Sequence, residues 1–180
     1  GKGHGAGGHA ANVRVVRATG DDELRDSVRA LVLGNDSRAP NEQELEEMAE
    51  LTGAALREGA FGFSVGLAYT PGVFAEKREI QRLLKTVADH DGLWTFHGHT
   101  YSWTSPFFRP KYIGKPHNVR DLEELLSLAE ETKVRTNVSH VIFKGKHTWR
   151  TYPKVLSLID EAVERGMDIA FDALPYHWGN

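Results

Sequence analysis

Two histidines each end a short strand-like segment, and histidine is a residue that binds zinc. Residues 92–97 end at His97, and residues 134–140 end at His140. An imidazole ring binds a divalent metal through a neutral nitrogen, and a catalytic zinc site needs about three protein ligands and one open position. The pattern therefore predicts two ligands of a metal-dependent hydrolase and leaves the other ligands unassigned.

The amino-acid composition limits the classes of partner and the cellular compartment that we expect for this chain. The 180 residues are 40% hydrophobic and 26% charged, which suits one soluble domain with a real core. The 22 basic and 25 acidic residues are interspersed, so we expect no nucleic acid partner. No apolar run approaches the roughly 18 residues of a membrane span, and residues 1–10 look like a flexible lead without signal-peptide features, so we expect no membrane partner and a cytoplasmic location. Without cysteine, any metal must be held by nitrogen and oxygen.

Hydrophobic periodicity predicts that strands and helices alternate along the chain. The expected strands are 12–17, 60–66, 93–97, 134–139 and 167–172, and the expected helices are 41–57, 76–90, 120–132 and 153–165. Gly59, Gly92 and Gly166 follow three of these helices, where a positive φ would turn the chain back into the sheet.

This alternation predicts parallel strands joined by right-handed crossovers, either in an open doubly wound sheet or in part of an eight-stranded barrel. The polar residues of interest, such as His97 and His140, stand at the carboxyl ends of strands. Barrel enzymes carry their chemistry at those ends, which favours the barrel.

Several segments together resemble one enzyme family. They are LGNDSRAP (33–40), GAFGFSVGLAYTPG (59–72), the segments that end at His97 and His140, and DALPY (172–176). In this order they resemble the N-acyl-D-amino-acid deacylase (D-aminoacylase) branch of the metal-dependent amidohydrolase superfamily. The resemblance covers nearly the whole chain.

The resemblance implies a fold and a set of site residues. The family fold is a (β/α)8 barrel of the TIM type, and residues 1–180 would form a partial barrel domain, about strands three to seven. His97 and His140 would end the fifth and sixth strands as ligands of zinc, of which the parent enzyme would hold one or two ions. Tyr69 and Tyr176 would lie near the substrate. His99 replaces the arginine usual in the family and is expected to bind substrate.

The reaction implied by the resemblance is hydrolysis of a C–N amide bond in a small N-acyl amino acid or related amide. A water activated by zinc would attack the acyl carbonyl, and an aspartate would move the proton. The first-strand His-x-His and that aspartate have no counterpart here, so no catalytic residue is identified in this segment. The family commonly has lysine where this chain has Ile142, which makes free-acid substrates doubtful unless Lys144 or Lys146 receives the carboxylate.

Two other functions remain open. One is a non-catalytic half-barrel that serves as a binding module or scaffold, and the other is a dihydroorotase-like cyclic amidase. Residues 61–66 contain no lysine, which argues against the hydantoinase-like branch, where a carboxylated lysine bridges two metals. An incomplete barrel exposes strand edges, so we expect them to be covered by a second copy of the chain or by the remaining barrel segments.

Overall fold

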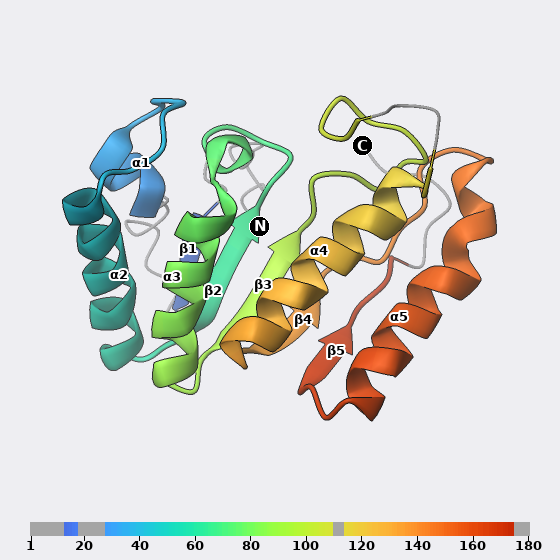
Figure 1. Ribbon diagram of the computed structural model, residues 1–180. Coiled ribbons are helices and arrows are strands. Elements are labelled where there is room, and N and C mark those ends of the chain that lie inside the picture. Colours follow the sequence, from blue (N-terminus) through green and yellow to red (C-terminus); the bar gives the residue numbers. More distant parts are fainter. Residues whose placement is uncertain (1–12, 18–27, 110–113, 175–180) are drawn as a thin grey trace, which may run out of the picture.

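Five strands and their connecting helices follow one another along the chain (Figure 1). The structure is a computed structural model that describes residues 13–17, 28–109 and 114–174. The predicted lead 1–10 and Tyr176 lie outside these residues. The elements are β1 (Val13–Arg17), α1 (Val28–Leu33), α2 (Glu42–Arg57), β2 (Ala60–Gly66), α3 (Lys77–Asp89), β3 (Leu93–His97), α4 (His117–Thr132), β4 (Arg135–Val138), α5 (Tyr152–Glu164) and β5 (Ile169–Phe171), with 3-10 turns η2 (Gly72–Phe74) and η3 (Thr148–Thr151).

The strands form one sheet in the order β1-β2-β3-β4-β5. Strands β2, β3, β4 and β5 are parallel, as predicted for part of an amidohydrolase barrel. Gly66 pairs with His97, and Phe96 pairs with Val138. The carboxyl ends of the four parallel strands therefore meet along one edge of the sheet.

The first strand differs from the prediction, because β1 pairs antiparallel with β2. Two of the described helices lie between these strands, and the first of them, α1, was not predicted. The inference of five parallel strands assumed one crossover helix between each pair. With two helices in the connection, and with β1 at the sheet edge, that assumption fails for this pair.

One face of the sheet packs against the helices. Figure 1 shows α2, α3, α4 and α5 side by side in one layer over the sheet. Phe63, Val65, Trp94, Phe96 and Val138 alternate along three strands and are buried in the core below that layer. Complete burial of a side chain such as Phe63 stabilises the fold by about 1.5 to 3 kcal/mol.

The opposite face of the sheet is polar where β2, β3 and β4 present it. We call Ser64, Thr95, Asn137 and Ser139 the polar face; all four are half-buried, and no described helix packs over them. The Thr95 and Ser139 hydroxyl oxygens lie 2.5 Å apart, and the Asn137 amide donates to Thr95 at 3.4 Å. His97 follows Thr95 by two positions on the same strand, so it projects from this face at the carboxyl edge.

The helix ends agree with the predictions from local sequence, except at the start of α4 and at Gly92. Asn41 and Glu44 form a capping box at the start of α2. Helix α4 begins at His117, three residues before the prediction, because the His117 and Asn118 amides donate to the carbonyls of the preceding loop. Gly59 and Gly166 adopt positive φ as predicted, at 100° and 86°.

Gly92 does not serve as the predicted left-handed turn residue. Asp91, one position earlier, takes that conformation with φ of 53°. A Cβ atom at Gly92 would lie 2.8 Å from a methyl carbon of Val87, so glycine is needed there for close packing. None of the described helices combines the length and apolar character required to cross a membrane.

Candidate metal centre

The two histidines predicted as metal ligands lie against each other at the carboxyl edge of the sheet. The Nδ1 atom of His97 is 2.5 Å from the Nε2 atom of His140, and the ring centroids are 4.6 Å apart. Strands β3 and β4 are adjacent and parallel, so residues at their ends are about one strand spacing apart. The fold thus brings together two imidazoles with converging nitrogens.

Two tyrosines surround His97. The ring of Tyr69, which comes from the loop after β2, lies 5.0 Å from the His97 ring. Tyr101 meets His97 edge to face at 4.9 Å, and its hydroxyl accepts the Gly98 amide proton at 3.0 Å. Tyr69 therefore lies beside His97, and its predicted place near the substrate stays a prediction.

Tyr101 was not predicted as a site residue. Its hydroxyl lies 3.5 Å from the Nε2 atom of His140. Burial holds the pKa of Tyr101 well above its ordinary value of 10.0, so the phenol keeps its proton and can donate it in a hydrogen bond. Its position in the sequence could have indicated a site residue, because Tyr101 stands four residues after His97 in a loop that starts at the carboxyl edge of the sheet.

His140 has an unusual backbone conformation and a lowered pKa. Its φ is 39°, in the left-handed region that residues other than glycine seldom adopt. Partial burial lowers the pKa of His140 below 6.5, the Lys144 charge lowers it further, and Asp172 acts in the opposite direction. At neutral pH the ring is therefore in the neutral form that a metal requires.

His99 contacts α4 and two phenylalanine rings, Phe107 and Phe108, in the loop after β3. Its Nδ1 atom is 2.7 Å from a carboxylate oxygen of Asp121, whose side chain is only 3% exposed. The other oxygen of Asp121 accepts the Thr100 amide proton at 3.0 Å. Residues two apart face the same side only within a strand. Because β3 ends at His97, His99 is not required to face the same side as His97. No described contact joins His99 to the histidine pair, and its predicted role in substrate binding stays a prediction.

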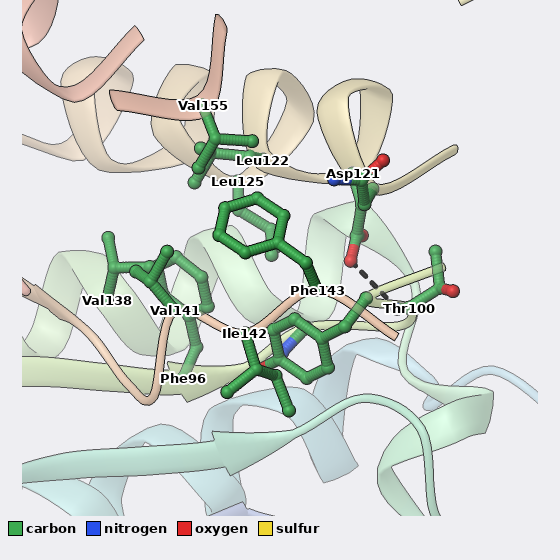
Figure 2. Close-up of a pocket in the computed structure, with 13 residues that line it drawn as sticks. Phe96, Thr100, Asp121, Leu122, Leu125, Val138, Val141, Ile142, Phe143 and Val155 are labelled. Atoms are coloured by element: carbon green, nitrogen blue, oxygen red, sulfur yellow. Dashed lines mark hydrogen bonds between the residues drawn. The ribbon is translucent and has the colours of Figure 1, made fainter. Parts of the chain in front are cut away.

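A small apolar cavity lies behind Tyr101, between the sheet and the helices. Figure 2 shows Phe96 and Val138 from the strands, Leu122 and Leu125 from α4, Val155 from α5, and Val141, Ile142 and Phe143 from the loop after β4. The cavity volume is about 30 Å³. That volume suits a single water molecule and is too small for an acyl chain. Ile142, which replaces the lysine usual in the family, therefore serves here as a packing residue.

The chemistry of the pair fits zinc as two of its ligands. Imidazole nitrogens bind zinc at about 2.0 to 2.1 Å, which places two ligand nitrogens of a tetrahedral site about 3.3 Å apart. The two nitrogens of His97 and His140 are closer than this, at 2.5 Å, so zinc binding would require the two rings to move apart. Among the described residues, no group of three His, Cys, Asp or Glu side chains could hold a metal ion. The described residues therefore supply an incomplete ligand set.

The sequence comparisons identify relatives of known activity. No protein-family model matches the chain. The chain is 28% identical over 154 residues to a D-aminoacylase of Alcaligenes xylosoxydans xylosoxydans. The aligned region covers 86% of this chain and 29% of that protein. The chain is also 28% identical over 152 residues to an N-acyl-D-glutamate deacylase of the same organism, which covers 83% of this chain and 28% of that protein.

Solved structures of the same two kinds of enzyme also match the chain. An N-acyl-D-glutamate deacylase from Bordetella bronchiseptica, in complex with zinc and a phosphonate mimic of the tetrahedral intermediate, superposes with a TM-score of 0.73 at 30% identity. That match covers 83% of this chain and 29% of the other. A D-aminoacylase structure that defines a novel subset of amidohydrolases matches with a TM-score of 0.70 at 26% identity, over 83% of this chain and 29% of the other.

The chain resembles the D-aminoacylase branch of the amidohydrolases. This D-aminoacylase-like segment spans less than a third of the length of the relatives that it matches. Metal is present among the structural relatives: one deacylase structure contains zinc, and one D-aminoacylase structure concerns the binuclear metal centre of that enzyme. The D-aminoacylase-like segment carries the histidine pair, and its described residues hold no group of three metal ligands.

Proposed function

We propose that this chain is part of a zinc-dependent amidohydrolase that cleaves the C–N amide bond of a small N-acyl amino acid or related amide. The observation that carries the proposal is the convergence of His97 Nδ1 and His140 Nε2 at the carboxyl edge of a parallel sheet. The resemblance to D-aminoacylases supports the reaction class. The remaining ligands and the proton-transferring aspartate belong to the rest of the barrel.

Each residue around the pair has a separate task in this proposal. When bound, zinc would activate a water molecule and polarise the acyl carbonyl. His97 and His140 hold the metal, and the lowered pKa of His140 keeps its ring neutral for that purpose. The Tyr101 hydroxyl, fixed by the Gly98 amide, donates a hydrogen bond to a substrate oxygen at the pair. The Tyr69 ring forms a side wall against His97.

The substrate carboxylate, where one is present, needs a cation near the pair. Ile142 packs against the apolar cavity and offers no charge. Lys144 is exposed, and its charge adds a minor contribution, after that of burial, to the lowered pKa of His140. We therefore assign Lys144 as the residue that would attract a free carboxylate, through solvent-screened attraction. Amides without a carboxylate would not depend on it.

The first experiment measures zinc stoichiometry in the purified chain after dialysis against zinc. His4 and His9 lie in a Gly-rich segment that could bind zinc by itself, so all variants are made in a background with both replaced by alanine. We expect about one equivalent of zinc from this pair, and its loss in His97→Ala and in His140→Ala. His90→Ala, an exposed histidine at the opposite end of β3, is the matched control and should keep its zinc.

The outcomes separate the candidate functions. Specific zinc binding that depends on both histidines supports the proposal and leads to hydrolysis assays with N-acyl amino acids. Zinc that is bound equally well by the His97→Ala and His140→Ala variants contradicts it. Absence of specific zinc favours the scaffold function, in which the half-barrel only supports chemistry completed elsewhere.

A further inference from the structure

Asp172 ties the end of β5 to the turn that carries His140. Its backbone amide donates to the Val138 carbonyl at 3.1 Å, and its carbonyl accepts the Val141 amide proton at 2.7 Å. These two bonds continue the parallel pairing of β4 and β5 by one step beyond Phe171. The backbone of Asp172 therefore brackets the turn on both sides of His140.

The side chain of Asp172 also binds the end of β4 and the turn that carries His140. One carboxylate oxygen accepts the His140 backbone amide proton at 2.7 Å. The other oxygen accepts a proton from the Asn137 side-chain amide at 2.8 Å. Both oxygens are thus engaged with the β4 end, although the residue is exposed to solvent. A carboxylate that accepts amide protons makes stronger hydrogen bonds than a neutral acceptor does.

The turn needs such support because His140 has a φ of 39°. A residue with a Cβ atom is rare in this conformation, which persists only where its surroundings enforce it. In this conformation the His140 ring meets His97 across the strand ends. A relaxation of His140 to an ordinary negative φ would turn its ring away from His97.

We propose that Asp172 is the positioning residue that holds His140 in its metal-binding orientation. This inference rests on the proposed zinc-binding function of the histidine pair. Asp172 acts through the His140 backbone: its two oxygens accept amide protons, and among the described residues it forms no three-ligand group with His97 and His140. Partners of this kind, which orient a ligand, typically contribute about 10-fold to 100-fold to metal affinity.

The test compares zinc affinity among Asp172 variants, measured by competition with a chromophoric chelator in the background that lacks His4 and His9. Asp172→Ala should weaken zinc binding about 10-fold to 100-fold. Asp172→Glu keeps the charge but displaces the carboxylate by one methylene, so it should also weaken binding. Asp172→Asn should restore most of the affinity, because its amide oxygen can still accept the His140 amide proton while Asn137 turns its own oxygen inward.

Asp168→Ala is the matched control. Asp168 is exposed and precedes β5 by one residue, and only its backbone carbonyl makes a described hydrogen bond. Its replacement should leave zinc affinity unchanged. Should Asp172→Ala fail to fold, Asp172→Glu provides the comparison, since it retains the charge and the backbone bonds.

A metal-free measurement separates this inference from the proposed function. In the nuclear magnetic resonance spectrum of the apo chain, the His140 amide proton should lie downfield because of its carboxylate acceptor, and it should move upfield in Asp172→Ala. A wild-type chain that binds no zinc overturns both the proposed function and the role in metal binding. Specific zinc binding in the wild type, with equal affinity in Asp172→Ala and Asp172→Glu, overturns the role of Asp172 alone.

Discussion

The Nδ1 atom of His97 lies 2.5 Å from the Nε2 atom of His140, although 43 positions separate the two residues along the chain. At this separation one proton can lie between the two nitrogens, whereas a zinc ion would require them to move apart to about 3.3 Å. Protonation and metal binding therefore compete directly at the pair. The pH dependence of the pair can be followed both through stability and through zinc binding.

The first prediction concerns stability and pH. Partial burial lowers the pKa of His140 below 6.5, so the unfolded chain takes up the proton first as the pH falls. The contribution of His140 to stability is therefore present above pH 6.5 and is lost as the pH falls through this value toward the lower pKa of the folded state. His140→Gln should lose less stability than the wild type between pH 7 and pH 5.5.

Urea denaturation in the presence of a chelator measures this difference. His90→Gln, which changes an exposed histidine at the opposite end of β3, should keep the wild-type pH dependence. An identical slope of unfolding free energy against pH in the wild type and in His140→Gln would contradict the prediction.

The second prediction concerns the carboxylate that holds the loop after β3. Asp121→Ala leaves the Thr100 amide and the His99 ring without their acceptor. Loss of a buried hydrogen-bond partner should lower the free energy of unfolding by about 2 kcal/mol. Asp160→Ala on α5, which removes an exposed carboxylate, is the control and should change stability by less than about 0.5 kcal/mol. Equal stabilities of the two variants would count against the role of Asp121.

The third prediction concerns the buried ion pair between Arg29 of α1 and Glu79 of α3. Both side chains are at most 1% exposed, and Arg29 also donates to the carbonyls of Asp36 and Arg38. Arg29→Met should lower stability by about 3 to 5 kcal/mol, because it leaves a buried carboxylate without its cation. Arg150→Met, at an exposed arginine of η3, should have little effect.

The pH dependence of Arg29→Met provides a second check. Burial raises the pKa of Glu79 to about 7 even with Arg29 present, so ionisation of this group opposes folding as the pH rises. Without Arg29 the carboxylate should be still harder to ionise. The defect of Arg29→Met should therefore be smaller at pH 5 than at pH 8, and a defect that is independent of pH would contradict this account.

The fourth prediction concerns the Tyr101 hydroxyl. Tyr101→Phe keeps the ring against His97 but removes the acceptor of the Gly98 amide. The free energy of unfolding should fall by about 1 kcal/mol. Tyr152→Phe, which removes an exposed hydroxyl at the start of α5, should leave stability unchanged. A Tyr101→Phe variant as stable as the wild type would show that the bond to Gly98 contributes nothing.

The parallel part of the fold could be predicted from sequence because its signals are local. The periodicities of β2 to β5 and of their helices give the elements, and parallel neighbours at once place His97 beside His140. The direction of β1 could not be predicted in this way, since an edge strand pairs in either direction when its connection contains two helices. Pairing direction depends on tertiary contacts that no local pattern records.

The surroundings of the site were harder to predict for the same reason. His99 was predicted to bind substrate, but its partner could not be predicted, because Asp121 lies 22 positions away on α4. The bond from Asp172 to the His140 amide likewise joins residues 32 positions apart. The distances along the chain show why such contacts have no sequence signature.

The polar face affects which interactions can drive closure of the barrel. Ser64, Thr95, Asn137 and Ser139 present hydroxyl and amide groups, which water hydrates well. Exclusion of water from that surface would therefore release little free energy. We expect closure of the barrel to be driven by pairing at the strand edges and by ligands shared with a metal, so that metal loading and closure are thermodynamically linked.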